Sequence, residues 1–190
     1  KVQNQLSTGR KILSPEDDPI AASEALEVGQ SKGVNKQFLD NQANAQSQWT
    51  YLESTLGSVS DALLGVTELA KQGDSPSLSS AQRGMIAAEL KGIQSNLLGL
   101  ANTQDGTGQY IFAGYKSSTK PFTQITQTTP PPIYSLGNTF VTYSGDAGKP
   151  TLSVTSSKDM AISENGLDVF MQVKDASGNV TGRSLFDNLQ

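Results

Sequence analysis

The side chains of this sequence that could support covalent catalysis are Ser117 and Lys120, which have the spacing of a Ser-x-x-Lys acylase motif. In such a site the serine hydroxyl attacks a carbonyl carbon after a neighbouring base takes its proton. Here the pair follows an expected strand rather than lying on a helix, and the partner motifs of those enzymes are missing. A loop without a catalytic role is the simpler interpretation.

Three other short motifs have ordinary structural explanations. The segment 145–149 (GDAGK) is too short between its glycines for a phosphate-binding loop, and Pro150 stands where that loop needs Ser or Thr. The segment 105–108 (DGTG) could start a calcium loop, but the later ligands are absent, so a helix-to-strand turn is simpler. The pair Asp17 and Asp18 could act in acid-base chemistry, yet carboxylates before Pro19 also suit a helix N-terminus.

Composition excludes several classes of function. The chain has 190 residues with no Cys and no His, which rules out a Ser-His-Asp triad, a thiol nucleophile, disulfides, and imidazole or thiolate metal sites. A net charge of −4 provides no basic surface for nucleic acid, and the longest apolar runs are far too short to cross a bilayer. We therefore expect no cofactor, no metal, no nucleic-acid partner and no membrane partner. Because the chain begins at Lys1 without an apolar leader, we also expect a fragment of a longer protein.

Residue patterns divide the chain into two parts. Only Phe38, Trp49 and Tyr51 are aromatic before residue 106, whereas aromatic residues are frequent afterwards. We predict an α+β protein in which an elongated antiparallel helical rod, residues 1–105, precedes a small, mostly antiparallel β domain, residues 106–182. Residues 183–190 are expected to begin a returning C-terminal helix.

The rod is predicted to contain two helices. After an extended loop over 1–18, the first helix runs from Pro19 to about Gly73, with Asp18 as its cap. The second starts at Ser79, where Gln82 completes a capping box, and ends near residue 102. Both carry a heptad seam, so the short turn between them favours an antiparallel helical hairpin. The seam of the first helix is Ala45, Trp49, Leu52, Leu56, Val59, Leu63, Val66 and Ala70.

The first helix is too long for its partner. At 1.5 Å per residue it would extend roughly 80 Å, against roughly 36 Å for the second helix. The seam upstream of about residue 45 therefore has no mate in this chain. An alternative is a break at Gly29 or Gly33 that folds the helix back. Without that break, the open seam is an interaction surface. Its apolar residues are Ile20, Ala21, Ala25, Val28 and Phe38.

Short alternating segments predict the strands of the second part. We expect strands at 109–115, 138–144, 151–155, 160–162 and 169–173, with a hairpin at 145–150, a connector at 126–132 and a turn at 177–179. Four aromatic residues could form a ligand-stacking surface, although aromatic residues in strands more often belong to the core. They are Tyr110, Phe112, Tyr115 and Phe122.

Two segments resemble a known family. Residues 6–12 (LSTGRKI) and 15–22 (PEDDPIAA) closely resemble the start of the helical core of bacterial flagellins and their relatives. Residues 101–116 (ANTQDGTGQYIFAGYK), followed by Pro121 and Phe122, look like the hook-filament junction branch of this flagellin-like family, the third hook-associated proteins. The resemblance covers residues 5 to about 123.

This resemblance implies a secreted structural subunit of the bacterial flagellum and no enzyme. Such subunits are exported unfolded by the flagellar type III apparatus and assemble as a ring between hook-associated protein one and the first flagellin layer. The expected partners are therefore hook-associated protein one, flagellin, and copies of the chain itself. An export chaperone would bind a C-terminal region absent here, which also includes the helix that covers the open seam.

The loop before the first helix carries basic and then acidic side chains, which could form complementary pairs between subunits. We therefore predict a subunit interface made by Arg10, Lys11, Ile12, Asp17, Asp18, Ile20, Ala25, Val28 and Phe38. Two alternatives remain open: a flagellin of the filament itself, and a surface carbohydrate-binding or acylase-like β domain carried on a helical stalk.

Overall fold

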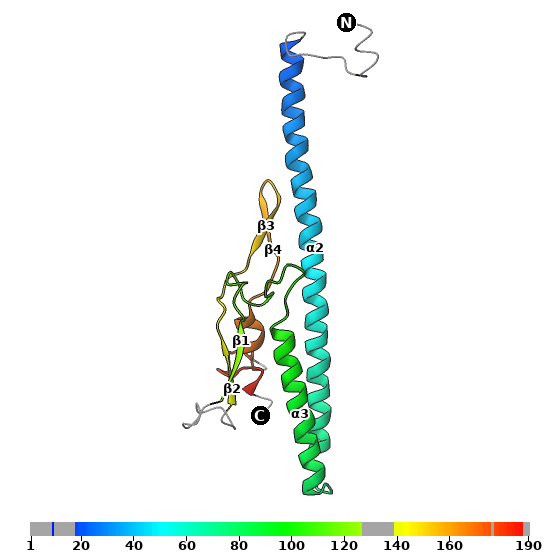
Figure 1. Ribbon diagram of the computed structural model, residues 1–190, viewed down its shortest axis with the longest axis vertical. Helices are drawn as coiled ribbons and strands as arrows, with labels where there is room; N and C mark the ends of the chain where they lie inside the picture. Colours follow the sequence, from blue (N-terminus) through cyan, green and yellow to red (C-terminus); the bar gives the residue numbers. More distant parts are fainter. Residues whose placement is uncertain (1–8, 10–17, 127–138, 176, 188–190) are drawn as a thin grey trace. The chain divides into compact units, whose positions relative to one another are not determined.

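The computed structural model describes residues 9, 18–126, 139–175 and 177–187. Its elements in chain order are the helices α2 (Pro19–Gly73) and α3 (Ser80–Ala101), then the strands β1 (Phe122–Thr126), β2 (Thr139–Tyr143), β3 (Thr151–Thr155) and β4 (Lys158–Ala161), then a π-helical turn, η1 (Leu167–Met171) (Figure 1). The predicted order of long helices followed by small antiparallel strand pairs is confirmed.

Contacts divide the chain into two units, and the boundary falls within α2. Unit 1 comprises Lys1–Asn44 with Ser153–Asp159, and unit 2 comprises Ala45–Leu152 with Met160–Gln190. The predicted domain boundaries, at 105 and 182, stay predictions.

Helix α2 has the predicted bounds because its capping groups are in place. The Asp18 carboxylate accepts a hydrogen bond of 3.0 Å from the Ala21 amide, and Pro19 occupies the first helical position, where an amide donor is not needed. The helix continues through Gly29 and Gly33, so the alternative of a break there is wrong. It ends at Gly73, next to the turn that leads to α3.

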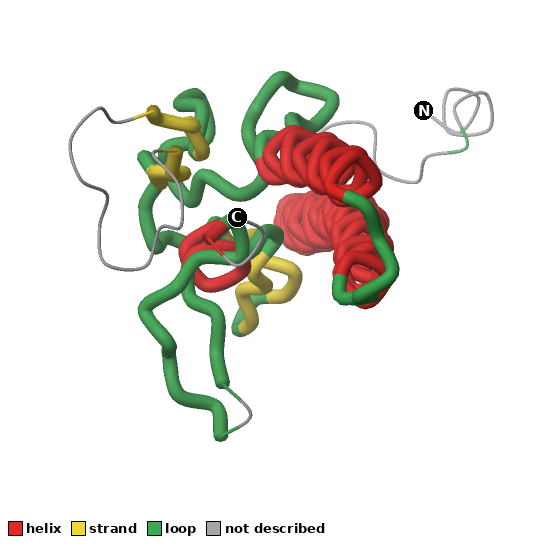
Figure 2. The backbone as a smooth tube through the Cα atoms, turned by 90° about the horizontal axis from the view of Figure 1, so that it is seen from below, coloured by secondary structure: helices red, strands yellow, loops and turns green. Residues whose placement is uncertain are grey.

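In unit 2, α3 packs antiparallel against the second part of α2, as Figure 2 also shows. A Cβ added to Gly65 would lie 3.6 Å from Ile93, and one added to Gly73 would lie 3.8 Å from Ile86, so the two helices run in opposite directions. The capping box of α3 is confirmed, since Ser79 and Gln82 bond each other reciprocally. The predicted seam residues Leu52 and Val59 of α2 are buried here, and so is Leu97 of α3.

The core of unit 2 is completed by aromatic rings from distant parts of the sequence. Phe122 lies at its centre, with ring centroids 5.2 Å from Phe170, 5.8 Å from Phe186 and 5.1 Å from Tyr143. Phe112 contacts Phe170 edge-to-face at 5.0 Å. Contacts of this kind add about 0.5–1.5 kcal/mol each to the effect of burial. The aromatic cluster therefore joins β1 and η1 to the chain on either side of them.

The prediction of a strand at 109–115 is wrong. This segment is a series of turns with a single bridge between Gln104 and Tyr110. Gly108 and Gly114 have positive φ angles of 81° and 70°, which bend the chain where a strand would stay extended. Phe112 is buried by these turns, not by the alternation of a strand.

The hairpin expected at 145–150 is also wrong, because β2 and β3 have different partners. β2 pairs antiparallel with β1, with Phe122 opposite Tyr143, while β3 pairs with β4. Strand β1 was not predicted. The Asp146 carboxylate accepts hydrogen bonds from the amides of Tyr115 and Gly148, and these bonds direct the chain away from a simple hairpin.

Of the remaining elements, β3 has the predicted bounds and β4 begins two residues before its prediction. The strand expected at 169–173 is wrong: η1 forms instead, because Asn165 accepts a hydrogen bond from the Asp168 amide and starts a helical turn. The turn at 177–179 is confirmed by the positive φ of Gly178, 84°. The connector at 126–132 lies almost wholly outside the described residues.

Candidate assembly interface

The part of α2 in unit 1 exposes apolar side chains that a folded domain would usually bury. Ile20 is 72% exposed, Leu26 is 74% exposed and Val28 is 68% exposed. On the unit 2 part of the same helix, by contrast, Leu52 and Val59 are buried. Groups of exposed apolar side chains of this kind mark interaction sites. The open seam that the sequence predicts is therefore present in this stretch.

The structure describes five of the nine predicted interface residues. Asp18 caps α2, Ile20, Ala25 and Val28 are exposed, and Phe38 is half-buried. The other four, Arg10, Lys11, Ile12 and Asp17, lie outside the described residues. That these nine residues lie at a contact with a neighbouring subunit stays a prediction.

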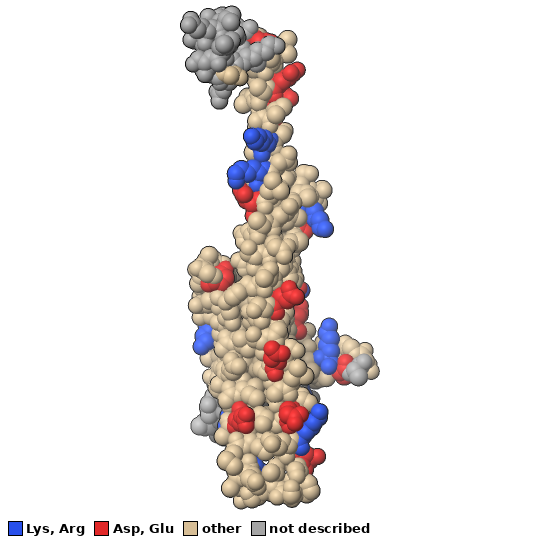
Figure 3. Space-filling model, turned by 90° about the vertical axis from the view of Figure 1, so that its right-hand side faces the viewer, with Lys and Arg blue, Asp and Glu red and all other residues tan. Residues whose placement is uncertain are grey.

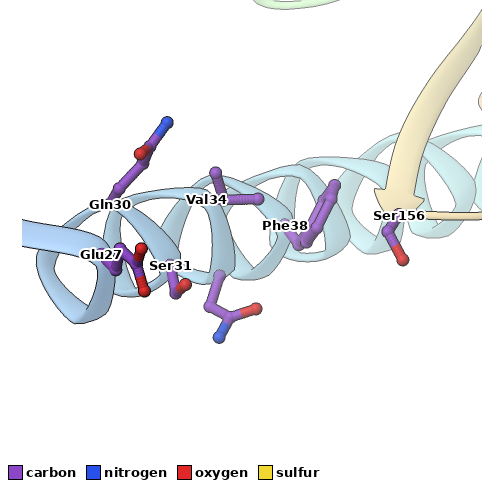
Figure 4. Close-up of a pocket in the computed structure, with 7 residues that line it drawn as sticks. Glu27, Gln30, Ser31, Val34, Phe38 and Ser156 are labelled. Atoms are coloured by element: carbon purple, nitrogen blue, oxygen red, sulfur yellow. The ribbon is translucent and has the colours of Figure 1, made fainter. Parts of the chain in front are cut away.

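A shallow groove of about 610 Å³ lies along α2 in unit 1. Val34 and Phe38 point to the same side of the helix (Figure 4). Ser31 lies about one turn before Val34, and Glu27 lies about two turns before it. Ser156, from the turn between β3 and β4, lines one end of the groove. The groove thus combines two apolar side chains with a carboxylate and small polar groups.

Two side-chain amides hold the β3–β4 turn region against α2 inside unit 1. Asn41 donates a hydrogen bond of 2.7 Å to the carbonyl of Ser153, and Gln42 donates one of 2.8 Å to the carbonyl of Val154. Val154 is buried. Gln42 lies three residues before the seam residue Ala45, and its amide binds a strand backbone at a position where the seam would otherwise carry an apolar side chain.

Sequence reasoning missed three exposed residues of this surface, namely Leu26, Val34 and Leu39. Val34 precedes Phe38 by four residues, and that spacing alone would have placed both on one side of the helix. Leu26 and Leu39 lie off the heptad seam. A search for one apolar face on the helix would not have found these two residues, because this stretch exposes apolar side chains on several sides.

Charges along this stretch change sign twice: Glu24 and Glu27 come first, Lys32 and Lys36 follow, and Asp40 comes next. In Figure 3 red acidic side chains are followed by blue basic ones and then by red again along this part of the molecule. Lys36 also pairs with Asp40 at 2.7 Å, although both side chains remain largely exposed. Such i,i+4 surface pairs contribute only about 0.3–0.5 kcal/mol.

The motifs that could have supported other chemistry are structural in unit 2. The Asp105 carboxylate accepts hydrogen bonds from Thr107 and from the Gln109 amide, which closes a turn. Burial alone would raise the pKa of Asp105, but these hydrogen bonds outweigh it and lower the pKa below its usual value. Within the described residues, no cluster of three or more carboxylates could hold a metal ion.

The aromatic set is divided between core and surface. Phe112 and Phe122 are fully buried in the core, so they form no ligand-stacking surface, whereas Tyr115 is 70% exposed. Ser117 uses its backbone carbonyl to accept a hydrogen bond of 2.8 Å from the Tyr110 amide and lies in a turn, not on a helix. In the part of the chain that the structure describes, neither helix has a stretch apolar and long enough to span a membrane.

Comparison with known proteins decides the family. Residues 1–117 match the family of the bacterial flagellin N-terminal helical region. This chain belongs to that family. The match includes α2, α3 and the turns that follow them, so the flagellin-type helical region contains the exposed stretch described above.

Individual relatives agree with the hook-filament junction branch. The chain is 34% identical over 173 residues to the flagellar hook-associated protein 3 of Salmonella typhimurium, which covers 91% of this chain and 50% of that protein. It is 39% identical over 124 residues to the flagellar hook-associated protein 3 of Escherichia coli. That match covers 65% of this chain and 39% of the length of that protein. The chain thus spans half or less of the curated relatives it matches.

A solved structure supports the same branch. The crystal structure of the flagellar junction protein FlgL from Legionella pneumophila is 27% identical, with a TM-score of 0.65 over 85% of this chain and 45% of that one. The resemblance to the third hook-associated proteins, predicted from residues 101–116, is therefore confirmed, as is the predicted place in the bacterial flagellum.

Proposed function

We propose that this flagellin-type chain is part of a structural subunit that joins hook-associated protein one to the flagellin filament. The observation that carries the proposal is the similarity to a named hook-associated protein 3, with 34% identity over 91% of this chain. The exposed apolar stretch of α2 supports an assembly role, because Ile20, Leu26 and Val28 need a covering surface from a later part of the same chain or from a neighbouring subunit. Burial of apolar area favours such contacts by about 25 cal/mol per Å².

The proposed partners are hook-associated protein one, flagellin and other copies of the chain in a ring. An export chaperone would bind the C-terminal region, and the subunit would be secreted through the flagellar export apparatus. This role requires no catalysis, and relatives that are flagellar structural proteins support that view.

Deletion of the gene for the full-length protein in its host tests this role. We expect cells that retain hooks and release flagellin into the medium, because the adaptor between them would be missing. Complementation with the intact gene controls for the deletion itself. Cells that swim normally without the protein would refute the proposed function.

The predicted contact of the N-terminal loop has a narrower test. Reversing Arg10 and Lys11 to Glu should weaken filament attachment while leaving the helical signal at 222 nm unchanged. Exposed ion pairs contribute only about 0–1 kcal/mol each, so the variant should show shorter or more easily sheared filaments, not a complete loss. Normal filaments under shear would remove these residues from the interface.

Flagellin of the filament remains the second candidate, because the matched family region is that of flagellin itself. Polymerisation of the purified full-length protein into long filaments without other subunits would favour it. A carbohydrate-binding or acylase-like β domain is the third candidate, and its support is reduced by the burial of Phe112 and Phe122. Labelling of Ser117 by an acylating reagent would favour that candidate.

A further inference from the structure

We draw no further inference here: the strongest candidate, the exposed face of small residues on α3 in unit 2, where a Cβ added to Gly84, Gly92 or Gly99 would meet open space, carries nothing because no described residue shows what covers it.

Discussion

The amide of Tyr115 donates a hydrogen bond of 2.9 Å to the carboxylate of Asp146, 31 residues further along the chain. The same carboxylate oxygen accepts a second bond, of 2.8 Å, from the Gly148 amide. Tyr143 donates a hydrogen bond of 2.8 Å to the backbone carbonyl of Asp146. One short loop thus ties the turns after α3 to the end of β2, at the point where a plain hairpin was expected.

Acid should weaken this connection. The hydrogen bonds from the Tyr115 and Gly148 amides lower the pKa of Asp146 below its usual value, and hydrogen bonds also lower the pKa of Asp175. A carboxyl group whose folded-state pKa is depressed stabilises the fold above its unfolded pKa, and the stabilisation is lost as the pH falls through the folded value. We therefore expect the melting temperature to fall steadily below about pH 4, the ordinary range for Asp. In Asp146→Asn this acid dependence should be smaller; an unchanged pH profile would contradict the argument.

Gly166 should not tolerate a side chain. An added Cβ would lie 2.5 Å from the Phe122 ring and 2.8 Å from the carbonyl of Phe112, both in the core of unit 2. Gly166→Ala should therefore lower the free energy of unfolding by about 1–3 kcal/mol, as overpacking typically does. Urea denaturation measures the loss. The matched control is Gly92→Ala on α3, where nothing lies within 4 Å, and that change should stabilise the helix by up to about 1 kcal/mol.

Phe122 should be the most costly core residue to truncate. Its ring is fully buried and contacts three other aromatic rings. Phe122→Ala should lower the free energy of unfolding by about 3–5 kcal/mol. Val180→Ala, which changes a residue 53% exposed, should cost little. Equal denaturation midpoints for the two variants would show that the aromatic cluster does not stabilise unit 2.

The capping box of α3 offers a local test. Ser79→Ala removes the hydroxyl that accepts the Gln82 amide at 3.3 Å and leaves that amide without its cap. We expect a loss of about 0.5–2 kcal/mol in unfolding free energy. Ser95→Ala, a change on the exposed side of the same helix, is the control and should be close to neutral. Faster amide hydrogen exchange confined to the first turn of α3 would confirm the mechanism.

Local signals in the sequence were sufficient for the two helices and for the seam residues of the exposed stretch, although not for Leu26, Val34 and Leu39. Asp18 and Pro19 determine where α2 begins, Ser79 and Gln82 determine where α3 begins, and the heptad spacing shows which side of each helix is apolar. Each of these effects acts over a few residues or one helical turn. The unequal length of the two helices then leaves part of the longer seam without a mate. For the same reason, the family resemblance could be stated from short stretches.

The β region depended on contacts that no local pattern contains. The partner of β2 and the burial of Phe112 outside any strand are decided by groups far apart in sequence, such as Asp146 with Tyr115 and Phe170 with Phe122. The turn at 167–171 begins with a local hydrogen bond from the Asp168 amide to Asn165, but its Phe170 side chain packs against the distant Phe122. An alternating sequence pattern shows which side chains lie on each face of a strand, but it does not show which strand pairs with it. Short apolar segments also pack equally well in strands, turns or helical turns. The tertiary structure alone selects among these, because only the folded chain brings the rings and hydrogen-bonding groups together.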